Sequence, residues 1–191
     1  MTNIQLQAMI QHDDESLFVN RGLRDYFSYR DLGIATASNG RIIAQINRAN
    51  YKLTEEGELH HHVLTHQINL VLKGNAIMKF EGIGEVALIT GTSFYMPPNI
   101  KHTFVSCSED FTTMEICTPA NFGTIEDDLA TYSESSQLPK PFSMQTAEQG
   151  IFEIKGLRAY LSYRDLGIEK ETNGSILAHI IRAEGGAYQG S

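Results

Sequence analysis

The stretch from residue 60 to residue 74 reads HHHVLTHQINLVLKG, and it decides the fold of this chain. It holds four of the seven histidines and continues into an alternating apolar run. Side chains at positions i and i+2 of a β-strand lie on the same face, so the imidazoles of His60 and His62 can reach one ion. A third imidazole has to come from a later strand, and His102 is the candidate. The sequence therefore predicts a metal site carried by strands.

Short segments of β-type sequence surround this stretch and are separated by turn residues such as Gly, Asn, Pro and Asp. Close spacing of many short strands is typical of all-β sandwiches and barrels. The segment 122–150 differs, because it is acidic and polar and contains Pro139 and Pro141. We expect it to be a linker with one short helix near residues 125–132. The predicted strands cover residues 41–49, 67–73, 76–80, 86–90, 93–96, 102–107 and 111–117.

Two spacings in this region resemble the motifs of the cupin superfamily. The first cupin motif has His-x-His, three or four residues, Glu or Gln, six residues and Gly, which matches His60 to Gly74 with Gln67 in the acid position. The second motif has Gly, five residues, Pro-x-Gly, two residues and His, which matches Gly91 to His102. Asn99 replaces the family glycine, and Asn also tolerates a left-handed turn. The opening Gly of the first motif is matched only loosely, and the resemblance covers residues 41 to 121.

The resemblance implies one divalent transition metal, which could be Fe(II), Mn, Ni, Co, Cu or Zn. Its ligands would be His60, His62, Gln67 and His102. His61 is expected on the opposite face of the strand, as is His66, in contact with solvent or another subunit. The alternative is a polar core that holds no metal.

Gln67 is neutral, so a divalent ion here keeps its positive charge and favours an anionic oxygen donor in its open positions. Gln67 could instead form a hydrogen bond to a water molecule on the metal. Glu115 is the nearest acid, but spacing alone identifies no catalytic residue. The substrate pocket is predicted from strand alternation and consists of Asn69, Val71, Met78, Phe94 and Phe104.

An internal repeat relates residues 17–49 to residues 151–183 at an offset of 134, with 19 of 33 positions identical. Arg24 and Tyr29 recur in the second copy, which has no metal motif beside it, so we expect these residues to serve structure. The second copy reaches Ser191 before any counterpart of the histidines. The chain is therefore either a shortened two-unit protein or one in which the incomplete second copy has a new structural role.

The repeat also sets the expected domain organisation. We predict a barrel with N-terminal strands over residues 1–121, a linker over 122–150, and a partial second repeat over 151–191. An isolated strand pair leaves an open edge and an apolar face. We therefore expect residues 151–183 to pack on the barrel of their own chain or of a partner, in a homodimer.

Composition excludes several classes of function. The chain has 191 residues with 41% hydrophobic and 20% charged residues, and its net charge of −8 disfavours nucleic acid and anionic membranes as partners. No run approaches the roughly 20 apolar residues of a membrane helix, and the first residues lack the pattern of a secretory signal. Two cysteines cannot form a disulfide framework. These features predict a cytoplasmic protein with a small-molecule ligand.

Together these observations predict an all-β fold, a cupin-type double-stranded β-helix (jelly-roll barrel), with extra C-terminal strands from an incomplete second repeat. The resemblance favours a metal-dependent enzyme that acts on a small, anionic organic molecule. An oxygenase, such as a dioxygenase, is placed ahead of an isomerase or lyase. The alternatives are a non-catalytic cupin that binds or senses a small ligand, and a metal site with only a structural role.

Overall fold

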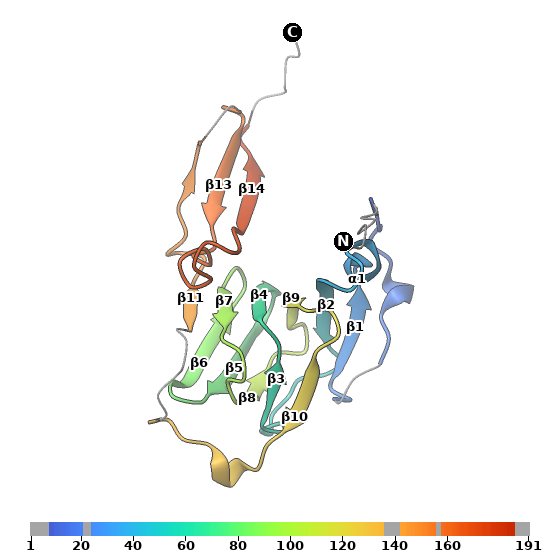
Figure 1. Cartoon of the computed structure of the whole chain (residues 1–191), viewed down its shortest axis with the longest axis vertical. Helices are drawn as coiled ribbons and strands as arrows, with labels where there is room; N and C mark the ends of the chain where they lie inside the picture. Colours follow the sequence, from blue (N-terminus) through green and yellow to red (C-terminus); the bar gives the residue numbers. More distant parts are fainter. Residues whose placement is uncertain (1–7, 21–23, 136–141, 156–157, 186–191) are drawn as a thin grey trace, which may run out of the picture.

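The computed structural model describes residues 8–20, 24–135, 142–155 and 158–185. In this part of the chain β-strands dominate, and they form two antiparallel sheets that enclose a barrel, with a smaller sheet beside it (Figure 1). The prediction of an all-β jelly roll is confirmed. No helix in these residues is long and apolar enough to span a membrane.

The larger barrel sheet has six strands and carries one wall of the interior. Strand β9 lies at its centre, between β2 and β4. The order across the sheet is β1 (Phe27–Asp31), β2 (Ile43–Ala49), β9 (Thr112–Thr118), β4 (His66–Lys73), β7 (Ser93–Met96) and β11 (Ser143–Gln145).

The second barrel sheet has five strands and carries the opposite wall. Strand β3 lies between β10 and β8, and β6 is the far edge. The order is β10 (Gly123–Glu126), β3 (His60–Val63), β8 (His102–Cys107), β5 (Asn75–Phe80) and β6 (Gly84–Ile89). The helical elements are short: η1 (Glu15–Leu17), α1 (Ile34–Ala37) and η2 (Leu129–Thr131).

The barrel forms because alternate residues of both sheets are apolar and face one another. The resulting core is rich in aromatic rings, and Phe27, Phe104 and Phe111 contact one another edge to face or at tilted angles. Such arrangements stabilise aromatic pairs beyond their buried area. The same three rings line the space that remains between the two sheets.

A third sheet is formed by the second copy of the repeat. It consists of β12 (Phe152–Glu153), β13 (Leu161–Asp165) and β14 (His179–Ala183). The turn that follows β13 buries Leu166 and Ile168 against Ile68 and Tyr95 on the outside of the barrel. Arg164 donates hydrogen bonds to the Gln145 side chain and the Thr146 carbonyl, which ties this sheet to the end of β11.

The segment 122–150 contributes to both barrel sheets, which differs from the linker expected from its composition. Its strand β10 pairs with β3, and β11 pairs with β7. The helix expected near residues 125–132 is a single 3-10 turn, η2, which Asp128 caps by accepting a hydrogen bond from the Ala130 amide. Pairing with existing barrel edges outweighs the polar composition of this segment, because each edge offers unpaired backbone groups.

Candidate metal centre

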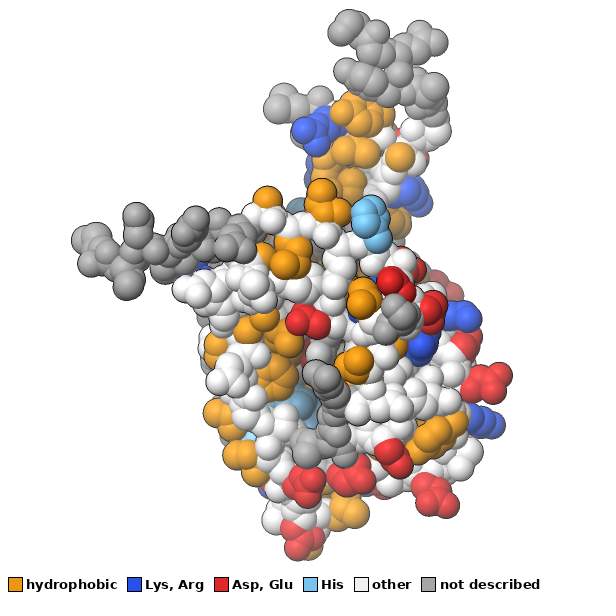
Figure 2. Space-filling model, turned by 90° about the vertical axis from the view of Figure 1, so that its right-hand side faces the viewer, with side chains coloured by type: hydrophobic (Ala, Val, Ile, Leu, Met, Phe, Trp, Pro, Cys, Tyr) orange, Lys and Arg blue, Asp and Glu red, His pale blue; other side chains and the backbone are white. Residues whose placement is uncertain are grey.

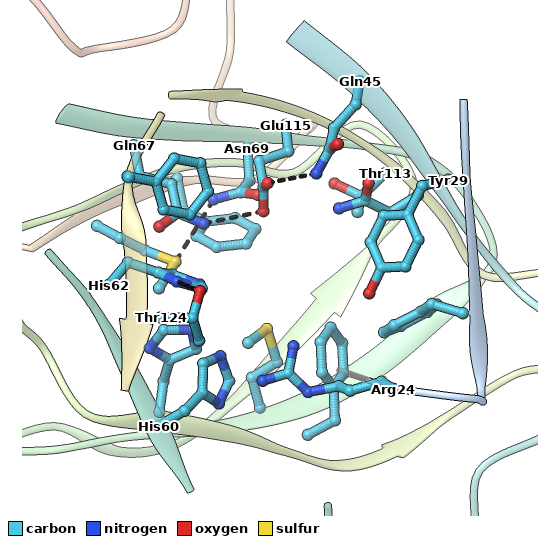
Figure 3. Close-up of a pocket in the computed structure, with 18 of the residues that line it drawn as sticks. Arg24, Tyr29, Gln45, His60, His62, Gln67, Asn69, Thr113, Glu115 and Thr124 are labelled. Atoms are coloured by element: carbon cyan, nitrogen blue, oxygen red, sulfur yellow. Dashed lines mark hydrogen bonds between the residues drawn. The ribbon is translucent and has the colours of Figure 1, made fainter. Parts of the chain in front are cut away.

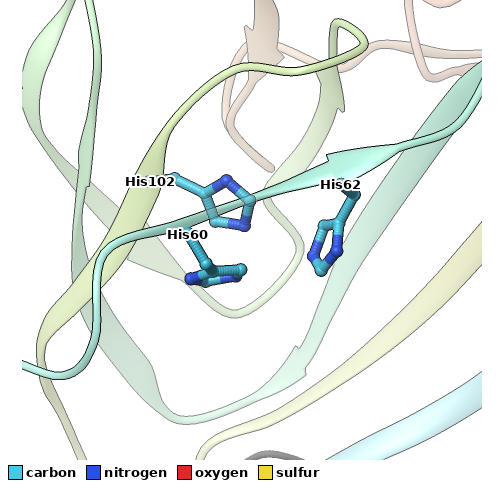
Figure 4. Close-up of side chains that lie close together, drawn as sticks. All are labelled: His60, His62 and His102. Atoms are coloured by element: carbon cyan, nitrogen blue, oxygen red, sulfur yellow. The ribbon is translucent and has the colours of Figure 1, made fainter. Parts of the chain in front are cut away.

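Three histidines from neighbouring strands meet inside the barrel. His60 on β3 is directly opposite His102 on β8, and His62 lies two residues along β3 on the same face. Their ring centroids are 4.0 Å apart for His60 and His102 and 5.1 Å apart for His62 and His102. One ring nitrogen of each lies within 4.8 Å of the others, so the rings surround a common space (Figure 4).

Hydrogen bonds to the Nδ1 atoms orient these rings. His60 Nδ1 donates to the Glu58 carbonyl at 3.0 Å, and His102 Nδ1 donates to the Ile100 carbonyl at 2.9 Å. His62 Nδ1 lies 2.9 Å from the Thr124 hydroxyl. The carbonyl partners fix a proton on Nδ1 of His60 and His102, so their Nε2 lone pairs are available to an ion. The Thr124 hydroxyl can accept from His62 Nδ1 in the same way, which is how histidine ligands are commonly positioned.

Burial keeps the three imidazoles neutral. It lowers the pKa of His60 to about 3 and that of His62 to about 4, and the nearby Arg24 charge adds to both effects. The pKa of His102 is also well below its ordinary value because the ring is buried and close to the other two. Neutral imidazole is the form that binds a metal ion. The donor set therefore fits a divalent transition metal.

Gln67 lies on β4, across the interior from the histidines. Its Nε2 donates to Glu115 Oε2 at 3.0 Å, so its Oε1 is the atom that remains available to an ion. Gln45 donates to the other oxygen of Glu115 at 2.8 Å. Burial raises the pKa of Glu115, and these two hydrogen bonds act against that rise. Among the described residues, no carboxylate joins the three-histidine group.

A cavity of about 250 Å³ lies between the two sheets and opens onto the histidines (Figure 3). Its walls differ in chemistry, since amide, hydroxyl and carboxyl groups come mainly from the six-stranded sheet and aromatic and thioether groups from both. The polar wall contains Tyr29, Gln45, Asn47, Gln67, Asn69, Thr113 and Glu115. The apolar wall contains Phe27, Met78, Phe94, Met96, Phe104, Phe111 and Phe122.

Arg24 places a positive charge in the same cavity. Its side chain is half-buried, and its Nε atom is buried without a hydrogen-bond partner. In the described part of the chain, no ion pair joins it to a carboxylate. A partly buried positive charge with no carboxylate in direct contact attracts negative charge, so this site favours an anionic ligand.

Four of the five residues predicted for the substrate pocket line this cavity, namely Asn69, Met78, Phe94 and Phe104. Val71 does not line it and is buried in the apolar core. Away from the cavity, His61 binds Asp127 at 2.6 Å, and His66 binds the Tyr95 hydroxyl at 3.1 Å.

Sequence reasoning missed several residues of the site. Arg24 and Tyr29 were expected to serve structure because they recur in the second copy, yet here both line the cavity. Phe122 and Thr124 lie in the expected linker, and no pattern in the sequence indicates them. The sequence does contain one indication that Arg24 belongs to the site: it is a charged residue three positions before a strand that begins with buried residues.

The two motif segments meet inside the barrel in the arrangement that the cupin spacings imply. β3 and β8 pair at the histidines, and the motif turn residues Gly74 and Asn99 both have left-handed backbone, with φ of 71° and 62°. The fold is that of a cupin. No protein-family model and no curated protein sequence matches the chain.

Solved structures similar to this chain include an RmlC-like cupin from Shewanella frigidimarina NCIMB 400, with a TM-score of 0.48, 19% identity and coverage of 62% of this chain and 96% of that chain. Oxalate decarboxylase from Bacillus subtilis has a TM-score of 0.48 and 15% identity over 64% of this chain and 34% of that one. Salicylate 1,2-dioxygenase from Pseudoaminobacter salicylatoxidans, in an adduct with gentisate, has a TM-score of 0.45 and 12% identity over 56% of this chain and 30% of that one. The matched part is thus about a third of the two enzyme chains, and the likeness concerns the fold alone.

Removing one histidine of the group should abolish tight metal binding. The protein is expected to bind one divalent transition ion per chain, and His102→Gln should weaken that binding at least about 100-fold, since the loss of an orienting partner alone costs 10–100-fold. Isothermal titration with Zn(II) or Mn(II) measures the affinity. His66→Gln is the control, because His66 lies outside the group, and equal losses in both variants would contradict the assignment.

The stability of the metal-free protein should fall as the pH is lowered from about 6.5 toward 4. In this range the unfolded chain protonates its histidines while the folded chain keeps three of them neutral, so the unfolded state binds more protons. The pKa of Glu115 is raised in the folded protein, so this one group favours the folded state as the pH falls and offsets part of the loss of stability. The net loss is up to about 3 kcal/mol per pH unit. Urea unfolding across this range measures it, and a flat profile would show that the three rings are not buried as described.

Proposed function

We propose that this cupin is a metal-dependent enzyme that acts on a small organic anion. His60, His62 and His102 would hold one divalent transition metal, with Gln67 Oε1 as a further ligand. Arg24 would bind a carboxylate or similar group of the substrate. When bound, the metal supplies Lewis-acid or oxygen-activating chemistry to a substrate in the cavity.

The observation that carries this proposal is that Arg24 shares one cavity with three neutral imidazoles. A divalent ion on three neutral ligands keeps about two units of positive charge, and the guanidinium adds another. Among the described residues that line the cavity, Glu115 is the only acid, and Gln45 and Gln67 already engage both of its oxygens. An anionic ligand would offset the remaining charge, whereas a neutral ligand would leave it buried.

The size and lining of the cavity support a small guest with two unlike faces. Its volume of about 250 Å³ is below the roughly 300–1,000 Å³ of pockets for drug-sized ligands. Amides such as Asn69 and Gln45 can bind polar groups on one face, while Phe94 and Phe104 pack against an apolar face. An anion with a flat or apolar body fits this arrangement.

An oxygenase-type reaction is our first choice of chemistry. His60, His62 and His102 would hold the metal with few protein ligands, so coordination positions would remain for a substrate, which favours catalysis over a saturated structural site. We rank oxygenases ahead of isomerases and lyases, which is the order that the cupin resemblance favours. The same pocket also suits a cupin that only binds or senses its ligand, and turnover separates the two functions.

Loss of the Arg24 charge should selectively weaken the binding of anions. In the metal-loaded protein, Arg24→Gln is expected to raise the Kd for small carboxylates about 10-fold or more, because a hydrogen bond to a charged group contributes about 1.5–3 kcal/mol. Arg158→Gln is a matched control, since Arg158 is the repeat counterpart of Arg24 and is exposed. Calorimetry with a panel of aliphatic and aromatic carboxylates, and with their uncharged amides, measures the effect.

Equal affinities for acids and amides, or equal losses in both variants, would contradict the anion site. Oxygen consumption with Fe(II) and the tightest-binding carboxylate tests the reaction. Uptake of oxygen with conversion of the ligand supports the oxygenase. Binding without conversion under any metal supports the sensing function instead.

A further inference from the structure

The two copies of the repeat form the same β-hairpin. β1 and β2 pair with Tyr29 opposite Asn47, and β13 and β14 pair with Tyr163 opposite Ile181, which are the corresponding positions. The two hairpins therefore share backbone pairing and register. The two hairpins differ in the elements that pack against them.

In the first copy this hairpin is covered by the barrel. The outer edge of β2 pairs with β9, where Asn47 is opposite Thr113. The covered side chains are almost fully buried, with Tyr26 5% exposed and Asn47 7% exposed. Within one chain, the first copy thus shows how this unit is completed: an antiparallel strand extends its sheet, and its inward face lies inside the barrel.

In the second copy the corresponding side chains are much more exposed. β14 is an edge strand of its sheet among the residues described here. Tyr160, the counterpart of Tyr26, is 42% exposed, and Ile181, the counterpart of Asn47, is 57% exposed. Leu177 lies close to them along the chain and is also exposed. Figure 2 shows hydrophobic side chains gathered on this sheet above the barrel.

We propose that this surface, formed by the β14 edge with Leu177 and Ile181, is the interface between two copies of the chain. A second copy cannot offer its own β9, because both edges of that strand are already paired with β2 and β4. It can offer β14, which is an edge strand among the described residues and carries the same apolar side chains. The two β14 strands pair antiparallel about a two-fold axis, as isologous interfaces require.

Side-chain pairing along this axis is favourable. With Ile181 opposite its own copy, Ile180 is opposite Arg182 and His179 is opposite Ala183, so no like charges face each other across the strands. Like charges directly opposite destabilise a strand pair. The two isoleucines at the centre bury each other, and the joined sheet has six strands.

The charge distribution also favours a second copy. The chain has a net charge of −8, but residues 151–183 contain five basic and four acidic residues. This unit is therefore close to neutral on an otherwise acidic protein. Contact through this unit brings the two molecules together with little charge repulsion, whereas contact between the acidic barrels would not.

Sedimentation velocity of the full chain over a range of concentrations tests this interface. The wild type should be a dimer, and Ile181→Lys should be a monomer with at least about 100-fold weaker association. Ile89→Lys is the matched control, because Ile89 is 45% exposed on the edge strand β6 and should leave the dimer intact. A wild type that stays monomeric, or an Ile181→Lys variant that dimerises normally, overturns the proposal.

Cross-linking tests the register of the two strands. Directly opposite residues of antiparallel strands have Cα atoms about 4.5–5.5 Å apart, which suits a disulfide. Ile181→Cys should therefore form a covalent dimer on oxidation, while Ile89→Cys should not, and the native cysteines are buried. A dimer that does not cross-link through residue 181 overturns the antiparallel pairing. Metal content is unaffected in either case, so these outcomes are independent of the cavity.

Discussion

Three imidazoles lie side by side in the barrel interior, largely shielded from water, and the rest of this structure depends on that constraint. Each ring is costly to protonate in this position, and each is held by a hydrogen bond at Nδ1. The β3–β8 pairing that brings His60 opposite His102 also closes the barrel wall. The same strand contact therefore shapes the fold and assembles the donor set.

The repeat shows how far an identical residue can change its role with its surroundings. Arg24 lies in the cavity, whereas Arg158 at the corresponding position is exposed. Ile34 of the first copy is partly exposed, whereas Ile168 of the second is fully buried against the barrel. A hairpin of the same sequence can thus form a cavity wall in one place and an open face in another, because the partner strand decides which side chains are buried.

This dependence on partners explains what could be predicted from the sequence. Strand positions follow from alternation and turns, which are local, so β4, β5, β7 and β8 lie within a residue of their predicted bounds. The spacing of the histidines is also local on β3. The hydrogen bonds of Glu115 to Gln45 and Gln67 depend on the register of β9 with β2 and β4. The alternation of residues within a single strand does not reveal that register. β10 and β11 were missed for the same reason, since they extend edges already formed elsewhere.

Anomalous diffraction from crystals grown with a divalent transition metal tests the central claim most directly. The account predicts one strong peak inside the barrel, with Nε2 of His60, His62 and His102 each about 2.0–2.2 Å from it. A protein whose barrel shows no peak at saturating metal, or whose ion is held by other side chains, would contradict it.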